Sequence, residues 1–254
     1  MTAGSAALPR KRTLAILANR WVYGLCRHWL LVVNVFLGIY IGLPWLAPVF
    51  MKLGWTVAGQ AIYLIYSTQC HQLPERSFFL FGPQPMVSLA QVQGVLHLNT
   101  SNPFLLRQFL GNPEMGWKVA WSDRMVSMFG SLFVFGVGYA ALRKTLKPLP
   151  ILGLVLLAVP MALDGGSHLI SDMAGIGQGF RDSNAWLAFL TQHALPASFY
   201  LGDALGSFNS WLRLITGMLF GLGVVWAVYP LVHASLTEAG REIEEKFRRA
   251  NLAL

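Results

Sequence analysis

The sequence predicts an all-α integral membrane protein, a bundle of four transmembrane helices with both termini in the cytoplasm. Of its 254 residues, 55% are hydrophobic and only 12% are charged, whereas about one-quarter of a soluble domain is charged. Four apolar segments are each long enough to cross a hydrocarbon layer about 30 Å thick, which takes roughly 20 helical residues. These predicted spans are 29–51, 117–142, 149–170 and 211–232.

The distribution of basic residues predicts the orientation of the spans. The formal net charge is +8, and most Lys and Arg residues lie before the first span, between the second and third, or after the fourth. Loops rich in Lys and Arg stay on the cytoplasmic side, so these three segments are expected there. Basic charge placed in this way indicates contact with a membrane surface, and we expect no nucleic-acid partner.

The chain divides into three parts. Residues 1–28 are predicted to form a cytoplasmic interfacial helix, 29–232 the four-span membrane domain, and 233–254 a cytoplasmic amphipathic helix. The N-terminal prediction depends on apolar residues that share one helical face: Leu14, Leu17, Trp21 and Leu25. The C-terminal prediction depends on Glu residues placed four positions before Lys or Arg, the favoured order for helix pairs.

The spans carry further local signals. Pro44 and Pro48 lie in the outer half of the first span, where proline predicts a kink or an early end. The connection between the second and third spans is short, so these two are predicted to be antiparallel neighbours. Tryptophans lie at span ends, as is typical of an aromatic belt: Trp29, Trp117 and Trp211.

Two connections, 52–116 and 171–210, are predicted on the extracytoplasmic side. The first is too apolar for a plain loop, and Thr56–Gln69 and Met86–Leu98 are predicted as short helices at the outer interface. The second contains a predicted short helix over Asn184–His193. Short amphipathic or interfacial helices are therefore expected to cover the extracytoplasmic side of the bundle.

Three of the four spans carry charged residues at a shared depth. Counted at about 1.5 Å per helical residue, Asp123, Asp164 and Arg213 lie within about one turn of a common level, and Arg124 follows Asp123. Ionisable groups within a membrane usually pair, face a cavity or perform a function, because they are costly in hydrocarbon. Two interpretations stay open: an ion-pair network that fixes helix register, and an outward-facing polar cavity that binds an ion or a small polar ligand.

The third span also carries a candidate metal site. Asp164, His168 and Asp172 recur every four residues, so one helical face can present all three. A carboxylate, an imidazole and a second carboxylate suit zinc or another first-row transition metal. A divalent metal is therefore a candidate cofactor. The alternative is that Gly165-Gly166 breaks the helix before His168.

Two further groups are candidates outside the spans. Cys70 and His71 are adjacent, and a thiol beside an imidazole can bind metal or act as a nucleophile with the imidazole as base. Neighbours on a helix diverge by about 100°, so a packed cysteine is the alternative. Arg181 and Asn184 lie in a polar segment, where Arg181 is a candidate for holding a lipid phosphate or closing over the cavity. The alternative is a solvated loop.

These residues, in order, resemble an uncharacterised prokaryotic membrane-protein family, domain-of-unknown-function family 2085. The resemblance is carried between about Tyr63 and Pro230 by Cys70-His71-Gln72 with Pro74, Arg76-Ser77-Phe78, Ser122-Asp123-Arg124, Asp164-Gly165, Arg181-x-Ser183-Asn184 and Arg213-x-x-Thr216-Gly217. It implies a small multi-pass protein of the prokaryotic cell membrane with signature residues outside, and no known reaction. Ser122 stands where the family usually has Cys, Met125 where it has Cys or Asp, and His168 where it tends to have Gln. A thiolate metal site built from Cys70 and the second span is therefore not expected, while oxygen and nitrogen ligands stay open.

The candidate ligand-binding residues are therefore Cys70, His71, Arg76, Asp123, Arg124, Asp164, Arg181, Asn184 and Arg213. Three functions fit them: a binding protein or transporter-like module with an outward-facing polar pocket, a membrane-embedded enzyme acting on a lipid or lipid phosphate, and an accessory subunit of a membrane complex. The expected partner is the lipid bilayer, with a second copy or other subunits of a membrane complex as candidates. Whether the protein is an enzyme is left open.

Overall fold

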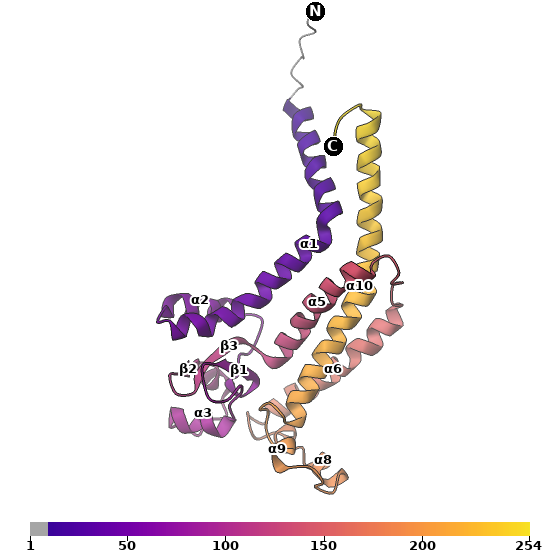
Figure 1. Cartoon of the computed structure of the whole chain (residues 1–254). Coiled ribbons are helices and arrows are strands. Elements are labelled where there is room, and N and C mark those ends of the chain that lie inside the picture. Colours follow the sequence, from indigo (N-terminus) through magenta and orange to yellow (C-terminus); the bar gives the residue numbers. More distant parts are fainter. Residues whose placement is uncertain (1–9) are drawn as a thin grey trace, which may run out of the picture.

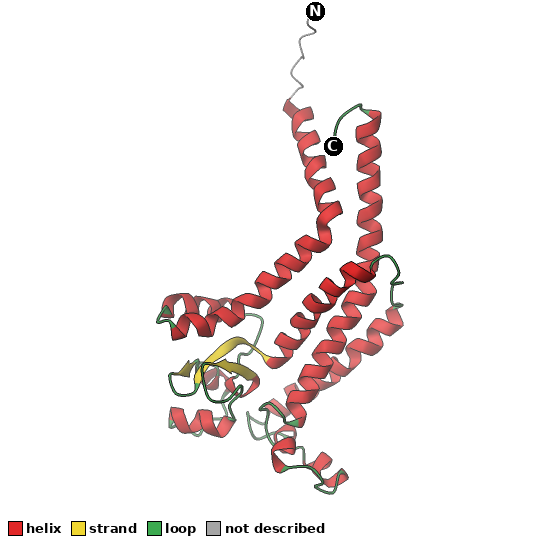
Figure 2. Ribbon diagram, in the orientation of Figure 1, coloured by secondary structure: helices red, strands yellow, loops and turns green. Residues whose placement is uncertain are grey.

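The computed structural model describes residues 10–254 and is mostly helical (Figure 2). Residues 1–9 of the predicted N-terminal helix lie outside the described residues. In the described part, four helices are long and apolar enough to cross a membrane. They are α1 (Arg10–Lys52), α5 (Asp123–Leu142), α6 (Ile151–Asp172) and α10 (Phe208–Arg249). The prediction of four membrane-spanning helices is confirmed in this sense.

Helix α10 packs against α5 and against α6 (Figure 1). Glycines allow both close approaches: a Cβ added at Gly221 would lie 2.0 Å from Ser131 Oγ of α5, and one at Gly223 would lie 3.0 Å from Leu157 Cβ of α6. Small residues let membrane helices approach closely. The second and third spans, predicted to be antiparallel neighbours, both pack chiefly on α10 and meet each other through the Arg124–Asp164 ion pair.

Replacing Gly221 by Val should destabilise the protein by about 2–3 kcal/mol, because the new side chain overlaps α5 and forces the two helices apart. Thermal unfolding in detergent measures the effect. Gly138→Val on α5 is the matched control, since no atom lies within 4 Å of a Cβ added there. Equal loss of stability in the two variants would contradict the close α5–α10 packing.

The second span begins at Asp123, not at residue 117. Residues before it form strand β3 (Gly116–Ser122), the central strand of an antiparallel sheet with β1 (Ser77–Leu80) and β2 (Gly111–Asn112). Short apolar runs do not distinguish a strand from a buried helix by hydropathy alone. Trp117 therefore lies in the sheet, and its predicted place at a span end is wrong.

The predicted terminal helices are continuous with the neighbouring spans. Helix α1 runs through Pro44 and Pro48, and α10 runs through Pro230 into the basic C-terminal segment. The N-terminal part of α1 and the C-terminal part of α10 extend beyond α5 and α6 at one end of the molecule (Figure 1). They contact each other, since the Tyr23 hydroxyl donates to Glu244 Oε1 at 2.5 Å.

The opposite end carries the sheet and short helices (Figure 1). These are α2 (Thr56–Tyr66), the 3-10 helix η1 (Pro74–Arg76), α3 (Leu89–Leu96), α4 (Pro103–Leu106), α7 (Phe180–Ser183), α8 (Ala185–Leu190) and α9 (Ala197–Tyr200). The short helices expected over 56–69, 86–98 and 184–193 are present in shortened form. An aromatic cluster joins this end to α1, with Trp121 of β3 packed edge-on against both Tyr40 and Tyr66.

Candidate functional site

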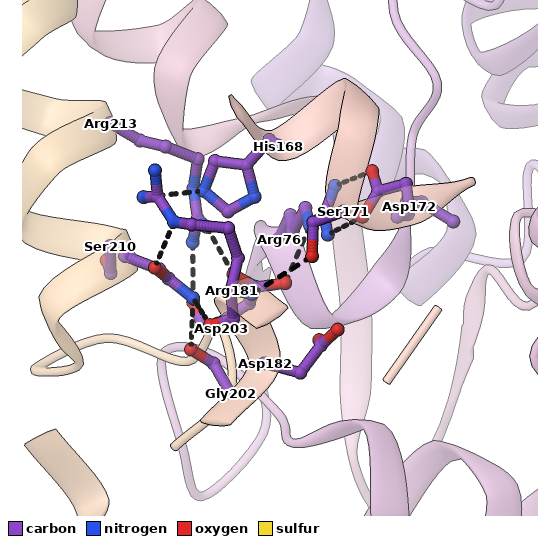
Figure 3. Close-up of polar contacts among 12 residues, drawn as sticks. Arg76, His168, Ser171, Asp172, Arg181, Asp182, Gly202, Asp203, Ser210 and Arg213 are labelled. Atoms are coloured by element: carbon purple, nitrogen blue, oxygen red, sulfur yellow. Dashed lines mark hydrogen bonds and ion pairs between the residues drawn. The ribbon is translucent and has the colours of Figure 1, made fainter. Parts of the chain in front are cut away.

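Arg213 of α10 links two carboxylates. Its Nε donates to Asp123 Oδ1 of α5 at 2.7 Å, and its Nη1 donates to Asp203 Oδ1 at 2.6 Å. Asp203, in the loop between α9 and α10, also accepts from Arg76 Nε of η1 at 2.7 Å. Arg76 in turn donates to both oxygens of Asp172, at the end of α6, at 2.6 and 2.7 Å (Figure 3). One chain of ion pairs thus joins three spanning helices to the short segments.

Asp164 of α6 is the centre of a second group. It accepts from Arg124 Nη2 of α5 at 2.7 Å and from Arg181 Nη2 of α7 at 2.8 Å. Arg181 also donates to Ser167 Oγ at 2.6 Å, and its Nη2 lies 3.1 Å from His168 Nε2 (Figure 3). The second group therefore ties α5, α6 and α7 together through one carboxylate.

Together these residues form what we call the ion-pair network. It contains four arginines (Arg76, Arg124, Arg181, Arg213) and four aspartates (Asp123, Asp164, Asp172, Asp203). The formal charges cancel, and most of the side chains are buried. Removing charges from water is costly unless they are paired and hydrogen-bonded, and this pairing is nearly complete. The arrangement fits the first interpretation of the charged spans, a network that fixes how the helices meet.

The predicted metal ligands are used in other ways. Helix α6 is unbroken through Gly165-Gly166, but Asp172 is bonded to Arg76 and Asp164 to two arginines, and His168 Nε2 lies 3.8 Å from Asp164 Oδ1. Among residues 10–254, no group of three or more His, Cys, Asp or Glu side chains is placed to hold a metal ion. The prediction of Asp164, His168 and Asp172 as a ligand set is therefore corrected, because guanidinium groups occupy the carboxylates.

Cys70 and His71 have separate partners. The buried Cys70 Sγ accepts from the backbone N–H of Ser122 at 3.4 Å, while His71 is exposed and its Nδ1 accepts from the backbone N–H of Leu73 at 3.1 Å. This geometry matches the packed-cysteine alternative. Asn184 is also structural in its contacts, since its amide donates to the carbonyls of Arg181 and Tyr200 at 2.7 and 2.8 Å.

A cavity of about 330 Å³ lies beside the network and contains Glu75, an acid that is not among the predicted site residues. It is lined by Glu75, Asp182 and Asp203 together with Ser88, Leu89, Ala90, Gln93, Ile176, Gly177, Leu201, Gly202 and Ala204. Glu75 is only 2% exposed, and neither carboxylate oxygen accepts a hydrogen bond in the described structure. Burial raises the pKa of Glu75 to about 7, although neighbouring Arg76 acts in the opposite direction.

The other two acids in this cavity differ in charge environment. Burial raises the pKa of Asp182, whose Oδ2 accepts from the backbone N–H of Gly179 at 2.8 Å. Burial also acts to raise the pKa of Asp203, but Arg76 and Arg213 outweigh it and hold that pKa well below its usual range. Asp203 is thus ionised and paired, whereas Glu75 and Asp182 retain acceptor capacity toward the cavity.

Lys118 is a second buried charged residue that sequence reasoning missed, because it fell inside the predicted second span. It lies on β3, fully buried, and its Nζ donates to the carbonyls of Gln72 and Arg107, both at 2.7 Å. Burial lowers the pKa of Lys118 to about 7, and the charge of Glu75 opposes this shift. Asp203 is another site residue that was not predicted, but the sequence contained an indication of it. The predicted site held four arginines and fewer aspartates, so a further buried acid was needed to balance their charge.

The fold and this site define a class: a helical membrane protein whose long helices meet in a buried, charge-balanced network of arginine and aspartate. Residues 114–227 match the model of the family described as Predicted membrane protein (DUF2085). The resemblance to that family is thus confirmed. The matched segment contains most of the network, while Cys70, Glu75 and Arg76 precede it.

A similar protein is known from an archaeon. The chain is 26% identical over 213 residues to the Uncharacterized protein MJ1492 of Methanocaldococcus jannaschii, an alignment that covers 81% of this chain and 92% of that protein. No solved structure matches the chain significantly.

Proposed function

We propose that this protein is a membrane binding protein whose ligand site is the cavity lined by Glu75, and that the ligand is a small organic cation such as an amine. The observation that carries the proposal is the Glu75 carboxylate, which is buried and has no hydrogen-bond partner in the described structure. Buried polar groups in native proteins are nearly always hydrogen-bonded, and an unpaired one is costly. A bound ammonium group would satisfy these two oxygens.

The rest of the cavity lining supports a cation that also donates hydrogen bonds. In residues 10–254, only one Asp182 oxygen accepts a hydrogen bond, and Ser88 and Gln93 add polar atoms to the lining. Ile176 and Leu201 provide apolar surface for a short alkyl chain. A volume of about 330 Å³ is at the lower end of the range for small-molecule sites, so the ligand is small.

The network itself argues against a phosphate ligand at this end of the protein. The lipid-phosphate alternative requires arginines to hold the phosphate, yet each of the four network arginines already donates to an aspartate. A phosphate would have to displace a buried carboxylate and leave it unpaired, which is unfavourable. Binding at the acidic cavity requires no such displacement.

We also propose that the cavity faces the extracytoplasmic side of a prokaryotic cell membrane and that both termini are cytoplasmic. The long basic ends of α1 and α10 lie together at one end of the molecule and the cavity-forming segments lie at the other (Figure 1). The basic α5–α6 connection is on the same side as the termini by chain order, as the positive-inside rule requires. The bilayer then surrounds the apolar faces of the four helices.

Stabilisation by small cations tests the proposed function. Detergent-purified protein should unfold at a higher temperature with ethanolamine, methylammonium or putrescine at pH 8, because a ligand at one hundred times its Kd stabilises by about 2.7 kcal/mol. Glu75→Gln should abolish this shift, whereas Glu114→Gln, which removes an exposed acid at the same end of the protein, should preserve it.

The same series can contradict the proposal. If none of these amines stabilises the wild-type protein, the organic-cation assignment fails. It also fails if Na⁺ or Ca²⁺ acts where the amines do not. An amine shift that persists unchanged in Glu75→Gln would place binding elsewhere on the protein.

A further inference from the structure

A second cavity, of about 430 Å³, lies at the end of the molecule that carries the termini. Its walls come from the N-terminal part of α1, the C-terminal part of α10 and the residue that follows α5. Three arginines line it, one from each wall: Arg27 of α1, Arg143 after α5 and Arg241 of α10. Because α5 ends here, the cavity lies at the boundary between the apolar bundle and the two-helix extension.

Within residues 10–254, these three arginines differ from those of the ion-pair network in forming no ion pair. None of them forms an ion pair with a carboxylate in residues 10–254. One acid, Glu244, also lines the cavity, and its Oε1 accepts from the Tyr23 hydroxyl at 2.5 Å. Three guanidinium groups and one carboxylate leave an excess positive charge, which an anion would offset.

Part of the cavity lining is apolar. Trp29 and Cys26 are buried there, and Leu236 completes the surface. Trp29 Nε1 donates to His233 Nδ1 at 3.4 Å, so its indole is held in place. The cavity therefore combines apolar groups with guanidinium groups at the end of the apolar bundle. This combination suits an anion attached to an apolar chain at the membrane boundary.

We propose that this cavity binds a phosphate group, with Arg27, Arg143 and Arg241 as its hydrogen-bond donors. A planar guanidinium donates two parallel hydrogen bonds to phosphate oxygens, and three of them from separate segments can surround one phosphate. Two sources share this chemistry: the headgroup of an anionic lipid and a soluble phosphate ester. The inference is independent of the proposed amine site, which lies at the opposite end of the molecule.

Isothermal titration calorimetry of the full chain in detergent tests the site with three probes: dihexanoyl-phosphatidylglycerol, dihexanoyl-phosphatidylcholine and glycerol 3-phosphate. The wild-type protein should bind the phosphatidylglycerol, less tightly as salt increases. Arg143→Gln combined with Arg241→Gln should weaken binding at least tenfold. The matched control is Arg248→Gln with Arg249→Gln, which removes the same charge from α10 outside the cavity and should change affinity less than twofold.

The probes separate the two sources. Binding of phosphatidylglycerol but not of glycerol 3-phosphate identifies a lipid headgroup as the ligand. Equal binding of both identifies a soluble phosphate ester. Either result supports the proposal if the cavity variant loses that binding. The proposal is overturned if the cavity and control variants weaken binding equally. It is also overturned if phosphatidylglycerol and phosphatidylcholine bind equally well and this binding survives in the cavity variant. Folding is not at issue, because Arg143 and Arg241 are exposed, and an unchanged unfolding temperature verifies this. Arg143→Lys with Arg241→Lys should bind with intermediate affinity, because charge is kept and the paired hydrogen bonds are lost.

Discussion

Replacing Asp203 by Asn should lower the free energy of unfolding by about 3–5 kcal/mol, the usual cost of breaking a buried ion pair from one side. Asp203 is the carboxylate shared by Arg76 and Arg213, at 2.7 and 2.6 Å. Both arginine side chains are at most 4% exposed, so water cannot replace the lost charge. The substitution keeps the shape of the side chain but removes its charge and turns one of its two acceptor oxygens into an amide donor, so the effect reports the lost ion pairs and hydrogen bonds and not packing.

Denaturant unfolding in a mild detergent measures this loss. Glu245→Gln is the control, since Glu245 pairs with Arg249 at 3.3 Å on the exposed end of α10, where such pairs contribute at most about 1 kcal/mol. A double variant, Asp203→Asn with Arg76→Gln, should be less destabilised than the sum of its single variants, because it removes one of the two uncompensated cations. Similar losses in Asp203→Asn and Glu245→Gln would show that the network is not effectively buried.

The spanning helices were predictable because a run of about 20 apolar residues is a local property of the chain. The start of the second span was not predictable, because the residues before it form β3. That strand depends on hydrogen bonds to β1 and β2, which are other segments of the chain. The order of helices in the bundle also escaped prediction. It depends on Gly221 and Gly223, whose missing side chains favour packing of α10 against both α5 and α6.

The same distinction between local and distant causes applies to the site. Asp123, Asp164 and Arg213 could be identified because charge is conspicuous inside an apolar segment. Asp203 and Glu75 lie in connecting segments, where acidic residues are ordinary and usually solvated. Their burial arises from tertiary packing, so hydropathy carries no sign of it. The metal site was wrongly predicted for a related reason. The spacing of Asp164, His168 and Asp172 correctly placed them on one helix face, but it carried no information on the arginines that other segments bring to that face.

Glu75 and Lys118 together should give the ligand-free protein a minimum in its free energy of unfolding near pH 7. Burial raises the pKa of Glu75 from 4.5 to about 7, so the folded state holds a proton that the unfolded state releases, and stability falls as pH rises between these values. Burial lowers the pKa of Lys118 from 10.5 to about 7. The unfolded state then holds the extra proton, and stability rises with pH between 7 and 10.5. The effect is on the order of 3 kcal/mol for Glu75 and on the order of 5 kcal/mol for Lys118.

Unfolding free energies measured from pH 4.5 to 10, for the wild type and two variants, test this prediction. Glu75→Gln should flatten the decline on the acidic side, and Lys118→Met should flatten the rise on the alkaline side. All three proteins share Arg76 and Asp203 near Glu75 and Arg107 near Lys118. Each variant also removes a charge that acts on the other titrating group, so the curves report Glu75 and Lys118 as a coupled pair. Parallel curves for the wild type and Glu75→Gln below pH 7 would mean that this carboxyl titrates normally.

The titration of Glu75 also links stability to the proposed amine site. An ammonium ligand pairs with the ionised carboxylate, so amine affinity should rise as pH increases through about 7 and level off above it. Binding would then oppose the loss of stability that ionisation of Glu75 causes in the empty protein. An amine whose affinity does not change between pH 5.5 and 8 cannot have this carboxylate as its main partner. Such a result would show that the amine binds at a site other than the Glu75 carboxylate.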